Sequence, residues 1–197
     1  METKVCVTGQ HREMLDQVLG LFHLEPDVDL DLMEPGQKLP ELTARVLIRV
    51  TEVLKKEKPD LVLIQGDTTT VMATAMAAFY QGIRVGHVEA GLRSGNPFSP
   101  FPEEMNRRVA SIVCSLHFAP TERAYQTLIR EGVPEEQVFL TGNPVIDALH
   151  MILDMPVPEK AKKIFELSSR ISYEPLFRRK LQFLSRRKLL LRKIQGF

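Results

Sequence analysis

Short apolar runs alternate with amphipathic segments over residues 3–154, and this alternation limits the fold more than any other feature of the sequence. Strand-like runs are followed by segments of about 10 to 20 residues with apolar side chains at helical spacing. Five such repeats are typical of βαβ units, so the sequence predicts an α/β protein with a doubly wound parallel sheet. The strand-like runs are KVCVTG (4–9), DLVLIQG (60–66), IRVGHVE (83–89), LHFAP (116–120) and QVFLTG (137–142).

The composition changes after residue 154. Pro156 and Pro158 interrupt the pattern, and from Lys160 onward twelve Lys and Arg face only two acids, although the whole chain has a formal net charge of +1. We therefore predict a Rossmann-like domain over 1–154 and a basic tail over 155–197, either helical or disordered. The stretch PLFRRKLQFLSRRKLLLRKI could form a basic amphipathic helix.

Several protein classes are not expected. The sequence has no apolar run of 18 residues, and METKVCVTG lacks the pattern of a secretory signal. Cys6 and Cys114 lie in apolar segments without metal-ligand spacing, so we expect reduced thiols, no metal site and a cytoplasmic location.

Polar side chains follow every predicted strand. In an open parallel sheet, ligands bind beyond the carboxyl ends of the strands, so these side chains should share one rim. Thr121 and Glu122, after the fourth strand, look like an ordinary helix start. The other rim residues are Gln10 and His11, Asp67, Glu89 and Arg93, and Asn143.

The long charged segment 86–108 raises the question of catalysis. Asp67 could simply cap the helix that follows it. Glu103 and Glu104 could be first-turn acids that form surface ion pairs with Arg107 and Arg108. We expect His117 and His150 to be packed or solvated rather than catalytic, and His87, which alternates with Val85 and Val88 along its strand, to be structural.

Glu89 does not fit such a structural role. It ends an apolar strand and precedes Ala-Gly, a sequence typical of close backbone approach. A partly desolvated carboxylate there, with Asp67 and Glu103 on the same rim, is suited to proton transfer on a polar part of a substrate. The residues themselves do not identify that substrate.

GDTTTVMATAMAAFY, GHVEAGLRSG, SPFPEEMNRR and TGNPVIDAL, in this order and spacing, closely resemble the non-hydrolysing UDP-N-acetylglucosamine 2-epimerases, as does HREMLDQVL. The resemblance runs from about residue 3 to residue 153. It implies the N-terminal half of a glycosyltransferase-B-type fold with the active site between two domains. The implied activity is isomerisation of UDP-GlcNAc and UDP-ManNAc for polysaccharide biosynthesis, by elimination and re-addition of UDP, without a metal or cofactor.

The resemblance also assigns residues. Asp67, Glu89 and Glu103 match the family's acids, which act in removing the proton at the sugar C2 and in handling the sugar. Gln10 and His11 match the region where bacterial members bind a second UDP-GlcNAc as activator, and Gln37 is assigned to the same region. For the remaining rim residues, Arg93, Arg107 and Asn143, we expect contacts with the carboxylates or the ligand. Family members are usually dimers, so a homodimer is also implied.

The chain departs from the family at both ends. A preceding strand with a GTRPE-type turn, the C-terminal domain and its histidine-arginine motif are not found in the sequence. We therefore expect a fragment that is inactive by itself, lacking its first βα unit. For the tail we favour a shifted reading frame over an anchor for anionic membranes, and nucleic-acid binding is not expected.

Two other interpretations remain open. The chain could be a non-catalytic sugar-nucleotide-binding or regulatory module, anchored to a membrane or nucleic acid by its basic tail. It could also be a glycosyltransferase of similar fold, although GHVEAGLR followed by PFPEE favours the epimerases.

Overall fold

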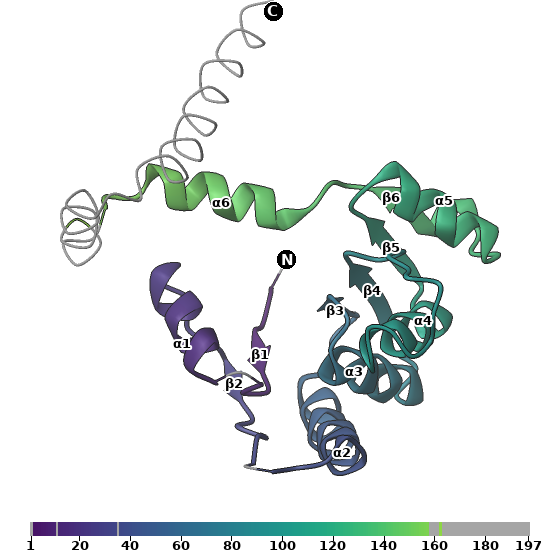
Figure 1. The fold of residues 1–197 in the computed structure, drawn as a ribbon. Helices are drawn as coiled ribbons and strands as arrows, with labels where there is room; N and C mark the ends of the chain where they lie inside the picture. Colours follow the sequence, from purple (N-terminus) through teal and green to yellow (C-terminus); the bar gives the residue numbers. More distant parts are fainter. Residues whose placement is uncertain (1, 11, 35, 158–161, 163–197) are drawn as a thin grey trace, which may run out of the picture. The chain divides into compact units, whose positions relative to one another are not determined.

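The computed structural model describes residues 2–10, 12–34, 36–157 and 162 of the chain. Strands and helices alternate over these residues (Figure 1), and the predicted α/β class is confirmed. In chain order the elements are β1 (Cys6–Val7), α1 (Arg12–Leu21), β2 (Val28–Asp29), α2 (Leu39–Glu57), β3 (Leu61–Gln65), α3 (Thr69–Tyr80), β4 (Arg84–Val88), α4 (Glu103–Val113), β5 (Leu116–Ala119), α5 (Glu122–Arg130), a 3₁₀ turn (Glu135–Gln137), β6 (Val138–Leu140) and α6 (Pro144–Asp154).

Two compact units divide the chain, Met1–Pro144 and Val145–Phe197. Of the second unit the structure describes little more than α6, whose apolar side chains are largely exposed. The predicted boundary at residue 154 stays a prediction. The proposed basic helix and the nature of the tail lie outside the described residues.

The first unit contains a four-stranded parallel sheet in the order β3-β4-β5-β6. Each strand pairs with the next one along the chain, and parallel crossovers are right-handed, so α3, α4 and α5 cover the same face. Figure 1 shows the four strands side by side in this order. The register aligns Gln65 with Val88 and Val88 with Phe118, so the carboxyl ends of the first three strands meet at one edge.

The main core lies between α2, α3, α4 and the first two strands of this sheet. Val46 of α2 is completely buried, and so are Ala75, Ala77 and Ala78 of α3. Because α3 carries such small side chains, α2 and α4 can pack closely against it. A second cluster beneath α5 contains Leu128 and Val138. Together the two clusters fix the loops at the carboxyl edge of the sheet.

The N-terminal residues differ from the prediction. β1 pairs with β2 in a separate two-stranded parallel sheet, Cys6 opposite Val28, rather than with the main sheet. β2 was not predicted, because two residues in an acidic stretch carry no apolar alternation. The main sheet is nevertheless tied to this part of the chain: the Thr70 hydroxyl at the start of α3 donates to Gln10 Oε1 at 2.8 Å.

Candidate active site

Glu89 lies directly after β4 in a left-handed backbone conformation, with φ of 68°. This region is unfavourable for a residue with a side chain, and such residues cluster at functional sites. Its half-buried carboxylate accepts a hydrogen bond from Asn143 Nδ2 at 3.2 Å. The other carboxylate oxygen lies 4.0 Å from where a Cβ at Gly66 would stand, so Glu89 faces the end of β3. The predicted proximity of Glu89, Asn143 and the β3 end is thus observed.

Gly91 explains why the segment after Glu89 reads Ala-Gly. Its φ is 84°, and a Cβ there would lie 2.3 Å from the carbonyl oxygen of Ala124 in α5. The chain must therefore approach α5 with a residue that has no side chain. Close packing of this turn against α5 holds Glu89 in its strained position.

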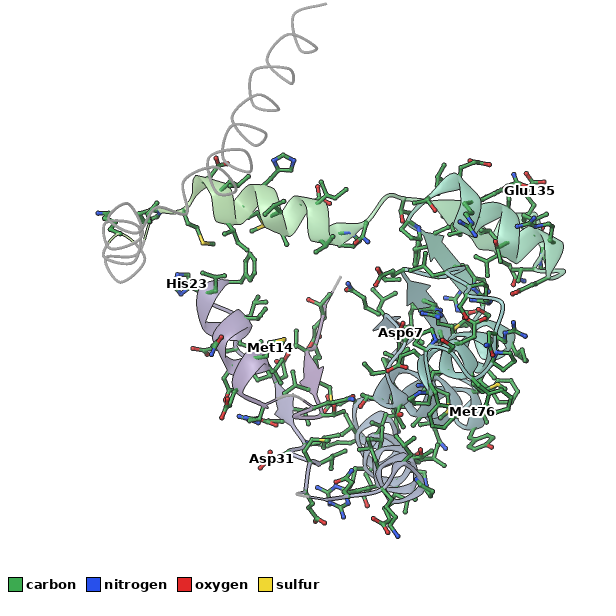
Figure 2. All side chains as sticks on the ribbon, in the orientation of Figure 1. Met14, His23, Asp31, Asp67, Met76 and Glu135 are labelled. Atoms are coloured by element: carbon green, nitrogen blue, oxygen red, sulfur yellow. The ribbon has the colours of Figure 1, made fainter. Side chains whose placement is uncertain are left out.

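Asp67 follows β3 and is held by α4 (Figure 2 labels Asp67). Its carboxylate accepts a hydrogen bond from Arg107 Nη1 at 2.7 Å, and its carbonyl oxygen accepts one from Asn106 Nδ2 at 2.9 Å. The cap of α3 is Thr68, whose hydroxyl accepts from Val71 N–H, so capping does not explain Asp67. Arg107 therefore contacts one of the predicted acids, as expected.

Glu104 is the residue of this region that sequence reasoning missed. It is 0% exposed, and its carboxylate accepts hydrogen bonds from Arg107 Nη2 at 2.9 Å and from Arg108 Nε at 3.1 Å. The Ser94 N–H also donates to it, at 2.9 Å. Burial alone would raise the pKa of Glu104, but the Ser94 N–H and the two guanidinium groups lower that pKa to about 2. The interpretation of these residues as surface ion pairs is therefore wrong for Glu104, because the pair is buried.

Glu103 begins α4 and is half-buried. Residues three and four apart lie on the same side of a helix, so Glu103 shares a side of α4 with Asn106 and Arg107. Both of those residues contact Asp67. Glu103 is thus on the side of α4 that faces the end of β3.

Arg93 points elsewhere. Its guanidinium donates to the Glu131 carboxylate at 2.8 and 3.0 Å and to the Ser111 hydroxyl at 2.8 Å. This pairing ties the loop after Glu89 to the end of α5. The predicted contact of Arg93 with the candidate acids is not observed, because Glu131 is its carboxylate partner.

The residues predicted for a second ligand site are only partly brought together. Gln10 contacts Thr70 at the start of α3, the helix that follows Asp67. Gln37 Oε1 accepts from the Glu34 N–H at 2.8 Å, and its Nε2 is buried without a hydrogen-bond partner among the described residues. His11 lies outside the described residues. Gln10 and Gln37 contact different residues, so a common site stays a prediction.

Two buried histidines lie beneath the rim. His87 and His117 are register partners on β4 and β5 and are 0% and 1% exposed. His87 Nε2 bonds to the Gly66 carbonyl at 2.7 Å, which fixes the turn before Asp67. Desolvation, and for His117 also the neighbouring His87, lowers the pKa of both, to about 4 for His117. Both are therefore neutral supports of the fold at pH 7, as predicted.

Neither metal ligation nor a membrane span is seen in the part of the chain that the structure describes. It contains no group of three or more His, Cys, Asp or Glu that could hold a metal ion. None of its helices is long and apolar enough to cross a membrane.

Fold and site together define a class: a parallel α/β protein that gathers carboxylates at the ends of consecutive strands. The family model for UDP-N-acetylglucosamine 2-epimerase matches residues 1–178. The chain belongs to this family, as the sequence motifs predict. It is 58% identical over 153 residues to the UDP-N-acetylglucosamine 2-epimerase of Salmonella typhimurium, covering 78% of this chain and 41% of that protein.

Solved structures agree with the family. The UDP-GlcNAc 2-epimerase from Neisseria meningitidis bound to UDP-GlcNAc has a TM-score of 0.75 and 48% identity, covering 89% of this chain and 46% of that one. The S. aureus MnaA–UDP co-structure has a TM-score of 0.77 and 45% identity, covering 82% of this chain and 43% of that one. The chain thus spans less than half the length of these relatives.

Proposed function

We propose that the first unit forms one side of the active site of an enzyme that interconverts UDP-GlcNAc and UDP-ManNAc. The observation that carries the proposal is the rim itself: Glu89, in a strained conformation, faces the strand end that bears Asp67. The helix that holds Asp67 also begins with Glu103. Membership of the 2-epimerase family supports the choice of substrate.

In the proposed reaction, a carboxylate of the rim removes the proton at the sugar C2 while the C1–oxygen bond to UDP breaks. The product of this step is a 2-acetamidoglucal, and UDP leaves with the bonding electron pair. UDP then returns to C1 while C2 receives a proton on the opposite face. Acid–base groups positioned in this way contribute about 10²- to 10⁴-fold to a rate.

The contacts of Asp67, Glu89 and Glu103 suggest that these acids have different roles in the reaction. Asp67 is fixed by Arg107, and Glu89 is fixed by Asn143. Among the described residues Glu103 forms no ion pair, whereas its neighbour Glu104 pairs with Arg107 and Arg108 inside the fold. We therefore assign proton transfer to Glu103 and Glu89, with Asp67 orienting the sugar. Arg93 acts through the loop, because Glu131 occupies its guanidinium.

Gln10, His11 and Gln37 are proposed as contacts for a second sugar nucleotide. Among the described residues the buried Nε2 of Gln37 has no hydrogen-bond partner, which supports this proposal because a ligand oxygen could accept from it. We also propose a cytoplasmic location, where the reduced Cys6 and Cys114 are stable.

We also propose that two copies of the chain associate as a homodimer. Met105 and Ile112 lie seven positions apart on one side of α4, and Phe101 precedes the helix; 46%, 82% and 63% of their surface is exposed. Exposed apolar stripes of this kind mark interfaces between proteins. An Ile112→Glu substitution should then shift the sedimenting species from dimer to monomer, whereas Ile48→Glu on α2 should not; a monomeric parent would contradict this part of the proposal.

The proposed function is tested in a chimera. Residues 3–153 of this chain replace the matching part of the Salmonella typhimurium relative, and conversion of UDP-GlcNAc to UDP-ManNAc is followed by product separation. We expect the chimera to be active and its Glu89→Gln variant to lose at least about 100-fold in rate. An epimerisation rate of the Glu89→Gln variant within about twofold of the parent chimera would show that Glu89 does not take part in the reaction.

A further inference from the structure

A cavity lies beside the rim, between the loop that follows Glu89, α4 and α5. Its volume is about 630 Å³, which is within the range of small-molecule sites. Glu131 is the one acid that lines it in the described part of the chain. The lining also contains the guanidinium-bearing residues Arg93, Arg107, Arg108, Arg123 and Arg130.

Three of these arginines are neutralised. Arg93 pairs with Glu131, and Arg107 and Arg108 both pair with the buried Glu104. Arg107 also reaches Asp67, on the rim. These guanidinium groups are therefore fixed in position and form a rigid wall of the cavity.

Arg123 and Arg130 are not neutralised. Within the residues that the structure describes, neither forms an ion pair with a carboxylate. Arg130 donates only to the Gln126 carbonyl and the Thr127 hydroxyl, which carry no charge. Two of the five arginines that line the cavity, Arg123 and Arg130, therefore carry a positive charge that no carboxylate of the described residues pairs with.

The spacing of these cations suits a particular ligand. Positions 123, 127 and 130 follow the i, i+4, i+7 pattern, so Arg123, Thr127 and Arg130 share the side of α5 that lines the cavity. Seven residues of helix span about 10 Å, too far for one phosphate to sit directly between the backbones. Long arginine side chains from both positions can instead hold two linked phosphoryl groups, which guanidinium binds with paired hydrogen bonds.

We propose that this arginine cavity binds a small anion with two linked phosphoryl groups, either free pyrophosphate or the diphosphate of a nucleotide. The site is distinct from the Glu89 rim and does not depend on epimerase activity. Arg107 borders the cavity and also contacts Asp67. The bound anion would therefore lie next to the arginine that holds this candidate acid.

The test measures pyrophosphate binding to the full 197-residue protein by calorimetry at low salt, together with the shift in its unfolding temperature. The variant Arg123→Gln/Arg130→Gln removes the two exposed cations without touching a buried group. The control Arg49→Gln/Lys55→Gln removes the same charge from the exposed side of α2. The unfolding temperature is measured as well, because a ligand raises it only when it binds the folded state in preference to the unfolded state.

We expect the parent and the control to bind pyrophosphate with the same affinity and to unfold at higher temperature in its presence. The Arg123/Arg130 variant should bind at least tenfold more weakly and lose the temperature shift. UDP and ADP are titrated in parallel: binding that depends on the same two arginines shows that the diphosphate can come from a nucleotide. Absence of binding by the parent, or equal weakening in both variants, would overturn the proposal, as would binding that survives in the Arg123/Arg130 variant.

Discussion

Replacing Glu104 with Gln should destabilise the protein far more than the same change at the adjacent Glu103. The ordinary pKa of a glutamate is 4.5, and that of Glu104 is about 2. Since each pH unit between the two values is worth about 1.4 kcal/mol, the charged form contributes about 3 kcal/mol to folding at neutral pH. Glu104 is completely buried, so solvent screens this contribution less than it would screen a surface ion pair. The amide would also leave Arg107 and Arg108 without their shared anion.

The assay is urea unfolding of the parent, Glu104→Gln and Glu103→Gln at pH 7.5, followed by circular dichroism. We expect a loss of about 3 kcal/mol in the free energy of unfolding for Glu104→Gln and less than about 1 kcal/mol for Glu103→Gln. Equal losses in the two variants, or a loss below about 1 kcal/mol for Glu104→Gln, would show that the buried network does not hold the loop and α4 together.

Further predictions concern the turn after Glu89 and the buried histidines. Gly91→Ala should cost about 3 kcal/mol or more in urea unfolding, because its Cβ would meet the Ala124 carbonyl oxygen at 2.3 Å. Gly95→Ala, with similar positive φ but open space around it, should cost only about 1 to 2 kcal/mol, and equal costs would argue against the close approach. Stability should fall by about 2 kcal/mol from pH 7.5 to pH 5, because unfolded His117 takes up a proton near its ordinary pKa of 6.5 whereas the folded pKa is about 4. His117→Gln should reduce this fall in chemical-denaturation measurements at the two pH values, and an unchanged fall would assign it to other groups.

Periodicity predicted the main parallel sheet, because its strands are apolar runs separated by clear helical segments. The four strands from Leu61 to Leu140 were found where the runs lie. β2 was not predicted, since Val28–Asp29 is too short to show any alternation. The pairing of β1 with β2 also depends on long-range hydrogen bonds that a local pattern does not contain.

The sequence predicted which candidate residues lie at the strand ends, but it did not predict which side chains are buried; the roles of these residues stay a prediction. Asp67, Glu89 and Asn143 follow strands, and parallel topology brings strand ends together. Glu104 was mistaken for a surface acid because the spacing of its arginine partners is the same for exposed and buried pairs. The carboxylate partner of Arg93 lies 38 residues away, directly after α5, and nothing in the sequence links the two.

We propose that carboxylates of the strand-end rim move the proton at C2 of the sugar. The most direct test is deuterium incorporation at C2 of UDP-GlcNAc in D₂O by the chimera that carries residues 3–153. We predict rapid incorporation by the parent chimera and by Glu122→Gln, a control that alters a helix-start acid, and at least about 100-fold slower incorporation for Glu89→Gln and Glu103→Gln. Incorporation within about twofold of the parent rate in both rim variants would show that these carboxylates do not move the C2 proton.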